Sequence, residues 1–328
     1  MTASVEAMQQ SAGAEAARRR DIAIGVAAAL ATVTLWAGWI VITRLGVTTT
    51  ALGPPDIGVL RFLIPLLVLS PVLLRKGLAL RRVGIPTMAL IVLGAGIPFF
   101  LVCTAGIGMV PAAQVGAMLP GTMPLFVALL AVAVMGERIG GWRLIGFALV
   151  ALGVGSIAIH AILEESAPGQ WRGHVLLLSA AFLWAVYTHA FRRAGIGAVH
   201  ATALVGFWSM LGFLPVYLLW LQPALLTAPI RDVAVQVLFQ GILSGLCSML
   251  TYAQAVKRLG ASRAAIFSGL VPALATLLAI PVLGEWPDAI TMLGIAAVGA
   301  GVALASALPS PALTQAAKPR QTAREPRR

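Results

Sequence analysis

Charged and titratable residues are scarce in this sequence. Only 10% of the 328 residues are charged and 59% are apolar, whereas a soluble domain has about 25% charged residues. Four histidines and eleven carboxylates provide little material for a hydrolytic site. Both cysteines, Cys103 and Cys247, lie inside apolar stretches, which excludes a disulfide framework and a cysteine-based metal cluster. We therefore expect no cofactor, no metal and no catalytic residues.

Long apolar stretches dominate what remains. The mean hydropathy is +0.95, and ten stretches have about the 20 residues that a helix needs to cross a bilayer. They lack the alternation of barrel strands and are joined by short connections. We therefore predict an all-α integral membrane protein with ten transmembrane helices. The predicted helices cover residues 22–43, 56–74, 85–107, 112–135, 142–162, 173–191, 200–221, 233–256, 262–283 and 289–308.

The positive charges predict how these helices are oriented. If the N-terminus is cytoplasmic, 19 of the 23 Lys and Arg residues fall on the cytoplasmic side and three fall outside, in agreement with the positive-inside rule. Residues 1–21 and 309–328 are then mobile cytoplasmic tails, the second of them basic. Because no aromatic–basic module accompanies the charge, we attribute it to topology and to anionic lipid rather than to nucleic acid.

The two halves of the sequence match each other at an offset of 148 residues. Between residues 113 and 154, 15 of 42 ungapped positions are identical to their counterparts. Each half holds five predicted helices, and an odd number inverts the second half in the membrane, as in many secondary transporters. The most distinctive matches are Leu35-Trp36-Ala37 with Leu183-Trp184-Ala185, Arg44 with Arg192, Pro124 with Pro272, and Gly136-Glu137 with Gly284-Glu285.

These ordered motifs resemble the EamA domain. The Leu-Trp-Ala motif of each half and the Pro…Gly-Glu pattern over each fourth helix carry the resemblance, together with the segment from Ala253 to Ala265. Two EamA-like repeats, here residues 22–162 and 173–308, make up the ten-helix members of the drug/metabolite transporter superfamily. The resemblance implies a plasma-membrane carrier, often an exporter of metabolites or amino acids, with a central cavity between the repeats.

Aromatic side chains are the first candidates for the wall of such a cavity. Trp36 and Trp39 are three residues apart and share a helix face, and Trp184 and Tyr187 repeat this pair in the second half. Rings on both sides of a cavity suit flat organic or cationic groups. The alternative is an aromatic belt at the membrane interface.

Polar and small residues supply further candidates on other helices. Phe100 and Thr104 match Ser248 and Tyr252 at the same offset. Gln114 and Met118 share one face of the fourth helix, and the amide of Gln114 needs a partner within the membrane. These faces suit a cavity wall, and they suit close packing between helices equally well.

Glycines are also duplicated on the fifth and tenth predicted helices. Gly146 and Gly153 match Gly294 and Gly301 at the same offset. Small residues two turns apart predict that these helices pack closely.

Apart from Arg143 and Arg263, which are the second residues of their helices, Arg61 is the only Lys or Arg within a predicted helix. It either binds a substrate carboxylate or reaches the nearby outer interface with its long side chain. Pro124 and Pro272 interrupt matched helices, so they are either paired hinges or elements that shape the bundle. Glu137 and Glu285 lie at matched loop edges on opposite sides of the membrane, where they cap helices or belong to a gate.

The sequence as a whole predicts a secondary transporter rather than an enzyme. No Gly-rich phosphate loop with its Lys is present, so ATP is not the driving force. We expect an exporter of amino acids or similar amphipathic molecules that works by alternating access. Drug efflux and passive facilitation are the alternatives, and a lipid-processing membrane enzyme is less favoured. The expected partners are a small-molecule substrate and the lipid bilayer. We expect a monomer in a bacterial-type plasma (inner) membrane, with both termini cytoplasmic.

Overall fold

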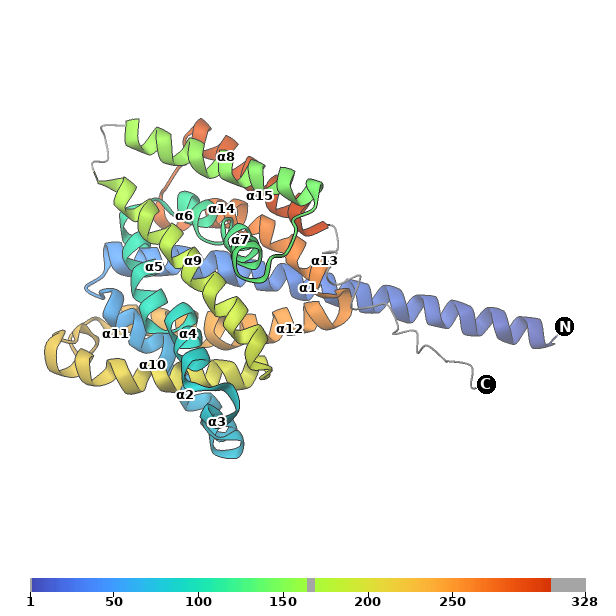
Figure 1. Cartoon of the computed structure of the whole chain (residues 1–328), viewed down its shortest axis with the longest axis horizontal. Helices are drawn as coiled ribbons and strands as arrows, with labels where there is room; N and C mark the ends of the chain where they lie inside the picture. The colour runs from blue at the N-terminus through green and yellow to red at the C-terminus, as the bar shows by residue number, and fades with distance from the viewer. Residues whose placement is uncertain (1, 164–168, 308–328) are drawn as a thin grey trace, which may run out of the picture.

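The computed structural model describes residues 2–163 and 169–307, and within them helices joined by loops are the only regular elements (Figure 1). Its helices are α1 (Thr2–Thr49), α2 (Pro54–Lys76), α3 (Leu80–Val83), α4 (Ile85–Ala95), α5 (Ile97–Met109), α6 (Ala112–Met118), α7 (Met123–Met135), α8 (Gly141–Leu163), α9 (Gln170–Ala194), α10 (Ala198–Trp220), η1 (Ala224–Leu226), α11 (Ile230–Gln236), η2 (Val237–Cys247), α12 (Ser248–Leu259), α13 (Ala261–Ile266), η3 (Phe267–Leu270), α14 (Val271–Leu283) and α15 (Ala289–Ala307).

The ten predicted transmembrane helices are confirmed. Over the described residues, ten segments are long and apolar enough to cross a membrane. Six spans are formed by the single helices α1, α2, α8, α9, α10 and α15, and four are composite: α4–α5, α6–α7, α11–η2–α12 and α13–η3–α14. Large apolar side chains such as Leu74, Leu152 and Leu293 are exposed on the surface of the bundle, as expected for a surface that contacts lipid tails.

The irregular spans occur at matched places in the two halves. Residues 119–122 separate α6 from α7, and the corresponding residues 267–270 form η3 between α13 and α14. Pro124 and Pro272 occupy the first turn of the helix that follows, where the missing N–H of proline costs no hydrogen bond. Each proline therefore begins a new helix segment after an interruption of the span.

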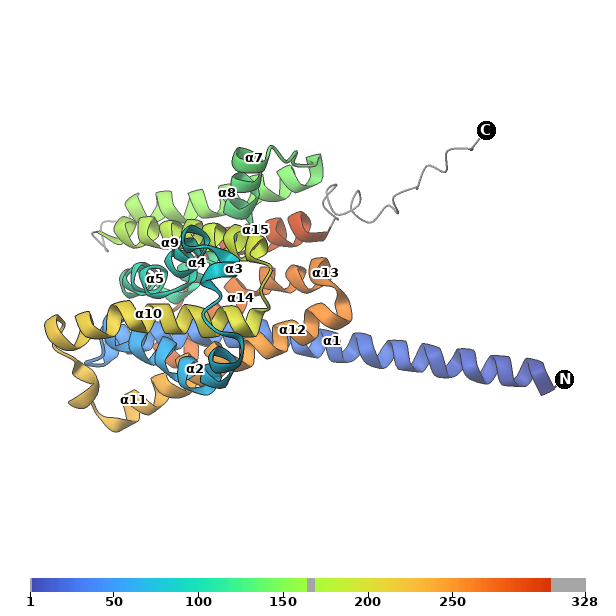
Figure 2. The same ribbon diagram turned by 60° about the horizontal axis from the view of Figure 1, so that its bottom comes forward.

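The two repeats interlock. The first span of each repeat packs on the third and fourth spans of the other: α1 lies against α12 and α14, and α9 lies against α4, α5 and α7. The second spans, α2 and α10, pack on each other, as do the fifth spans, α8 and α15. Figure 1 shows α8 beside α15 at one edge, and Figure 2 shows α2 beside α10. Every major interface in the centre therefore joins one repeat to the other.

Paired glycines bring α8 and α15 into close contact. A Cβ atom on Gly153 would lie 2.6 Å from the carbonyl oxygen of Gly294, and one on Gly301 would lie 2.5 Å from that of Gly146. Such contacts are too short for any side chain, so only glycine permits this approach. The sequence spacing of these four glycines predicted this packing, and the structure confirms it.

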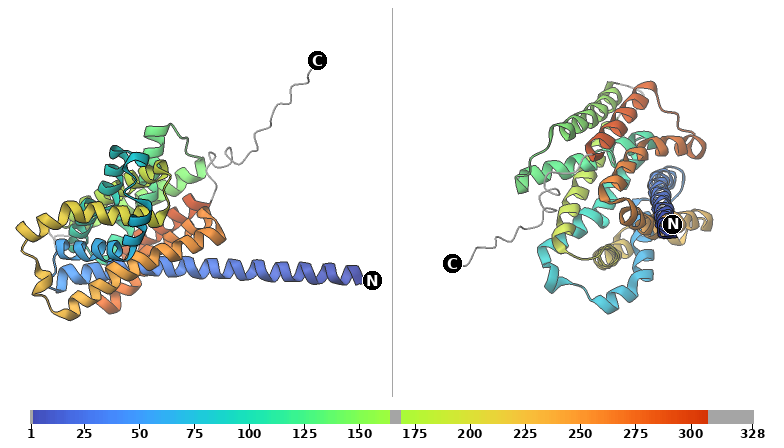
Figure 3. Two further views of the ribbon diagram at one scale, coloured as in Figure 1. Left: turned by 90° about the horizontal axis from the view of Figure 1, so that it is seen from below. Right: turned by 90° about the vertical axis from the view of Figure 1, so that its right-hand side faces the viewer.

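The N-terminal segment differs from the expectation of a mobile tail over residues 1–21. In the structure α1 begins at Thr2 and continues without interruption to Thr49, so that its N-terminal half projects from the bundle (Figure 3). Ala, Glu, Gln and Arg dominate this segment and are strong helix formers. They extend the first transmembrane helix beyond its apolar part. The predicted C-terminal tail, 309–328, lies outside the described residues.

A buried carboxylate joins α2 to α10 near the predicted outer side. Asp56 accepts hydrogen bonds from the Tyr217 hydroxyl (2.6 Å) and the Ala224 N–H (2.9 Å) through Oδ1, and from the Gly53 N–H (2.9 Å) through Oδ2. This cluster stabilises the start of α2 against the second repeat.

We expect Tyr217→Phe to lower the free energy of unfolding by about 1–2 kcal/mol, because a buried carboxylate loses a hydrogen bond. Denaturant-induced unfolding in detergent micelles measures the change. Tyr252→Phe is the matched control, because the Tyr252 hydroxyl forms no hydrogen bond with the described residues, and its stability should be unchanged. Equal stability of the two variants would contradict the assigned role of Asp56.

Candidate substrate site between the repeats

A polar network lies inside the membrane where α1 meets the eighth span. Gln240 accepts a hydrogen bond from the Trp39 indole (2.9 Å) and donates to the Thr43 hydroxyl (2.9 Å) and to Gln236 (3.1 Å). Gln236 in turn donates to the carbonyl oxygen of Ile42 (2.8 Å). All of these side chains are buried. The network therefore satisfies its polar groups without water and joins the two repeats at their centre.

The backbone of η2 contributes to this arrangement. Val237–Cys247 forms a π-helix, in which each turn is widened by one residue; π-turns are rare and occur frequently at functional sites. The matching third span is also irregular, since it breaks at Gly96 between α4 and α5. Gly96 and Ser244 are counterparts at the offset of 148. Both third spans therefore depart from a regular α-helix at equivalent positions of the two repeats.

Arg61 points from α2 into the bundle. Its Nη1 donates to the Ser244 hydroxyl (2.6 Å) and to the Gln240 carbonyl oxygen (3.3 Å), and its guanidinium carbon lies 5.7 Å from the centre of the Trp39 ring. Among the described residues no carboxylate forms an ion pair with Arg61. A positive charge thus lies between the repeats, and its hydrogen-bond and ring partners among the described residues are neutral.

The counterpart of Arg61 at the same offset is Ser209 on α10. Its hydroxyl accepts a hydrogen bond from the Ile97 N–H (3.2 Å) at the break next to Gly96. The second span of each repeat therefore contacts the irregular third span of the other repeat at equivalent positions. This pseudo-symmetric contact carries a cation in only one of its two copies, so the site is chemically asymmetric.

The predicted aromatic residues form two separate groups. Trp36 packs against Tyr252 with ring centres 5.6 Å apart, next to the Trp39–Arg61 contact. Trp184 packs against Phe99 (5.5 Å) and Tyr187 (5.0 Å) on the other side of the pseudo-twofold axis. No ring contact joins the two groups in the described part of the chain. Each group lies where a first span meets the third span of the opposite repeat.

The remaining predicted residues occupy several environments. Ser248 is buried and donates to the Ser244 carbonyl oxygen (2.6 Å), close to the Arg61 contact. Phe100 is buried against Phe62, with ring centres 5.8 Å apart. Phe62 directly follows Arg61 in the sequence. Thr104 is fully buried, and its hydroxyl has no hydrogen-bond partner among the described residues.

Gln114 and Met118 on α6 are buried and lie away from this network. His174 on α9 donates through Nε2 to Gln114 Oε1 (2.8 Å), which provides the partner that the amide requires within the membrane. Met118 is part of the apolar core. An apolar cavity of about 380 Å³ lies nearby, between α8 and α9, and is lined by Ala158, Ile162, Trp171, His174, Val175 and Leu178. Its apolar lining suits a lipid chain rather than a polar substrate.

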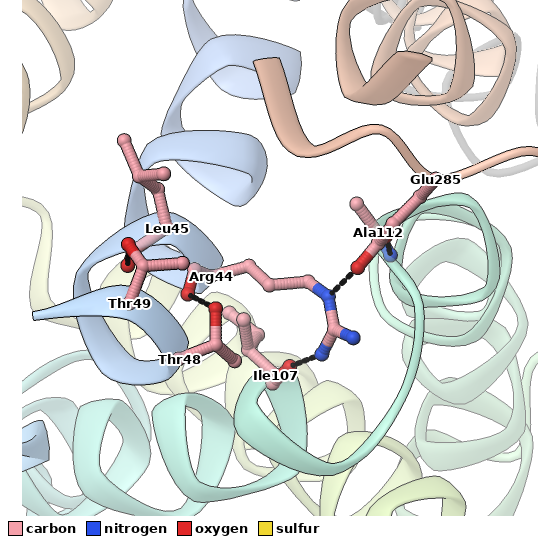
Figure 4. Close-up of polar contacts among 7 residues, drawn as sticks. All are labelled: Arg44, Leu45, Thr48, Thr49, Ile107, Ala112 and Glu285. Atoms are coloured by element: carbon pink, nitrogen blue, oxygen red, sulfur yellow. Dashed lines mark hydrogen bonds and ion pairs between the residues drawn. The ribbon is translucent and has the colours of Figure 1, made fainter.

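A second polar cluster lies at the predicted outer side (Figure 4). Arg44 at the end of α1 forms an ion pair with Glu285 and donates to the Ile107 carbonyl oxygen (2.8 Å). Glu285 also accepts a hydrogen bond from the Ala112 N–H (2.7 Å) at the start of α6. The cluster therefore ties the loop that follows α14 in the second repeat to three elements of the first repeat.

The loop that carries Glu285 is held at both ends. Gly284 ends α14 in the left-handed conformation (φ 69°), which favours glycine. Asp288 accepts hydrogen bonds from the N–H (2.8 Å) and hydroxyl (2.6 Å) of Thr291 in the first turn of α15. Burial raises the pKa of Asp288, but these bonds and the nearby His160 lower it more, so the net shift is downward. This ionised cap fixes the loop.

Sequence reasoning missed Gln236, Gln240, Asp56 and His174. Gln236 and Gln240 are four residues apart within an apolar stretch, and polar residues at that spacing share a helix face inside the membrane. This spacing could have identified them. Their matched positions in the first repeat, Met88 and Val92, are apolar, so the search for duplicated residues passed over them.

Ten spans in two interlocked, matched halves, with a polar centre at their interface, define a membrane transporter built from inverted repeats. The sequence matches the EamA-like transporter family over residues 23–159 and 171–307. The chain belongs to this family, and each match covers one five-span half. The likeness to the EamA domain is thereby confirmed.

A search of curated proteins finds no match. Among solved structures, a crystal structure of a protein is similar with a TM-score of 0.54 at 20% sequence identity, over 88% of this chain and 97% of the other. At this identity the likeness concerns the fold alone.

Proposed function

We propose that this protein is a secondary transporter that exports amino acids or similar amphipathic molecules, without ATP, by alternating access between its two repeats. The observation that carries the proposal is the position of Arg61. Its guanidinium lies between the repeats, bound to Ser244 and Gln240 and without an ion-pair partner among the described residues. Guanidinium groups bind carboxylates through paired, charge-assisted hydrogen bonds, so a substrate carboxylate would supply the missing counter-charge.

The surroundings of Arg61 favour a substrate that is amphipathic. The Trp39 ring beside the guanidinium and the Trp36–Tyr252 pair beyond it offer apolar surface next to the charge. A cationic drug would meet repulsion from Arg61 at this point. The same positive charge therefore favours organic anions and zwitterions over cationic drugs.

A flux assay in proteoliposomes tests the proposal. The panel contains amino acids, organic acids and a cationic drug, and each is measured with and without an imposed pH gradient. We expect saturable flux of molecules that carry a carboxylate and an apolar group. A flux that does not change when a pH gradient is imposed would identify a passive facilitator. Flux of the cationic drug alone would contradict the proposal.

We expect Trp36→Ala and Trp184→Ala each to reduce flux about fivefold without loss of protein from the membrane. The reason is that an aromatic contact to a substrate contributes about 1 kcal/mol. Trp142→Ala is the control, because Trp142 is 63% exposed on the surface of the bundle and should not affect flux. Unchanged flux in both test variants would show that the aromatic groups only pack helices together.

A further inference from the structure

The outer cluster has a counterpart on the predicted cytoplasmic side. Arg192 and Glu137 match Arg44 and Glu285 at the offset of 148 residues. The local backbone is also the same, since Gly136 ends α7 with φ 66° and Gly284 ends α14 with φ 69°. Each glutamate therefore leaves its helix in the same way, and each arginine lies at the end of the first span of its repeat.

The two pairs nevertheless differ in this structure. Arg44 and Glu285 form an ion pair and are about four-fifths buried, with side-chain exposures of 15% and 21%. Arg192 is exposed, and within the described residues it forms no ion pair with Glu137 or with any other carboxylate. The same two residue types on the same local backbone thus form an ion pair on the outer side and none on the cytoplasmic side, within the described residues.

The packing of the fourth spans explains the difference. On the closed side α14 is packed against α1, α6 and α15 and buries residues along its length, from Val271 to Ala279. On the other side α7 packs mainly against α9 and buries only Ala128 and Ala131 among its residues. His189 on α9 still contacts the Val127 carbonyl oxygen (2.9 Å) at the start of α7. Beyond Ala131 all remaining residues of α7 are exposed, whereas Ile280 and Leu283 at the end of α14 are half-buried, so the difference in packing includes the helix ends that precede the two glutamates.

We propose that Arg192 and Glu137 form the ion pair that closes the predicted cytoplasmic side in the opposite state of the protein, in which the Arg44–Glu285 pair opens. The structure described above is then the inward-facing state. The proposal rests on alternating access as the proposed function. Exchange of one ion pair for a chemically identical one keeps the free energies of the two states close, which a reversible two-state device requires.

Distance measurement by pulsed EPR in lipid nanodiscs tests this proposal without any substrate. Spin labels are attached at Gly140→Cys, in the loop after Glu137, and at Gly197→Cys, in the loop after Arg192, with Cys103 and Cys247 replaced by alanine. A Cβ atom at Gly140 or Gly197 meets no other atom within 4 Å, so both sites accept a label. We expect one long distance across the open cytoplasmic side.

Removal of the outer pair should shift the equilibrium. With Arg44→Gln we expect a second, shorter distance, because the closed outer side loses its ion pair. Addition of Glu137→Gln or Arg192→Gln should reduce this short-distance population by about two- to fivefold, the effect of one ion pair that solvent still partly screens. Addition of Arg193→Gln is the matched control, since it removes the same charge one residue away and should leave the population unchanged.

Two results would overturn the proposal. One is the absence of a short distance in the Arg44→Gln protein. The other is a short-distance population that responds to Glu137→Gln and Arg192→Gln no more than to Arg193→Gln. Exchange of the two charges, with Glu137→Arg and Arg192→Glu together, should restore the population. Because no transported molecule is involved, a failed flux assay would leave these distances, and the conclusion drawn from them, intact.

Discussion

Arg61→Gln is expected to reduce the flux of carboxylate substrates by about 10- to 100-fold. A charge-assisted hydrogen bond from a buried guanidinium contributes about 1.5–3 kcal/mol, and 1.4 kcal/mol corresponds to a factor of ten. Glutamine keeps a polar side chain, but it is shorter and lacks the charge and the forked geometry. Flux into proteoliposomes of defined protein content measures the loss. Arg61→Lys should retain part of the activity, because its charge remains while the paired geometry is lost.

A matched control separates the role of Arg61 from a general effect of charge. Arg231→Gln removes an exposed arginine at the start of α11 and should leave flux unchanged. The amount of protein in the membrane should be similar for all three variants. Full carboxylate flux in Arg61→Gln would reduce Arg61 to a structural residue that joins α2 to η2, and the proposed substrate class would then be wrong.

Gly153→Val is expected to destabilise the folded protein by at least about 2 kcal/mol. The new side chain would meet the carbonyl oxygen of Gly294 at 2.6 Å and Val298 at 3.0 Å. Overfilling a packed interior costs about 1–3 kcal/mol even where side chains can move aside, and here the obstacle is backbone. The helices α8 and α15 must therefore separate, and with them the fifth spans of the two repeats.

Gly155→Val is the control for this substitution. It introduces the same β-branched side chain into the same helix two residues away, where a Cβ atom meets nothing within 4 Å. Size-exclusion chromatography after heating, together with denaturant unfolding in micelles, compares the two variants. Equal stability would show that the close approach of α8 and α15 is not required for the fold.

Most of the architecture could be predicted from the sequence, because membrane insertion depends on local composition. About 20 apolar residues must form a helix in lipid, since unpaired backbone groups cannot remain there. Ten such stretches and the offset of 148 residues therefore predicted ten spans in two inverted halves. The glycine spacing of α8 and α15 also predicted a close contact, because glycine has no side chain to keep two helices apart and can be recognised in the sequence.

The candidate site was predicted only in part. Trp39 and Arg61 were identified from duplication and from an isolated charge, and the structure brings them together. Gln240 joins them but has no polar counterpart in the first repeat. The search for duplicated residues therefore could not find it. Its role depends on the packing of α1 and α2 against the π-helical η2, which is a contact between distant segments.

The two Gly-Glu loops have the same local conformation but different contacts, and these two properties have different origins. Both loops leave their helices through a left-handed glycine, and the Gly-Glu motif alone indicates this, because the conformation depends on neighbouring residues. The motif does not indicate that Glu285 forms an ion pair with Arg44 while Glu137 and Arg192 form none in the described residues. That choice depends on how α7 and α14 pack against the opposite repeat, and a sequence with two equivalent halves permits both arrangements.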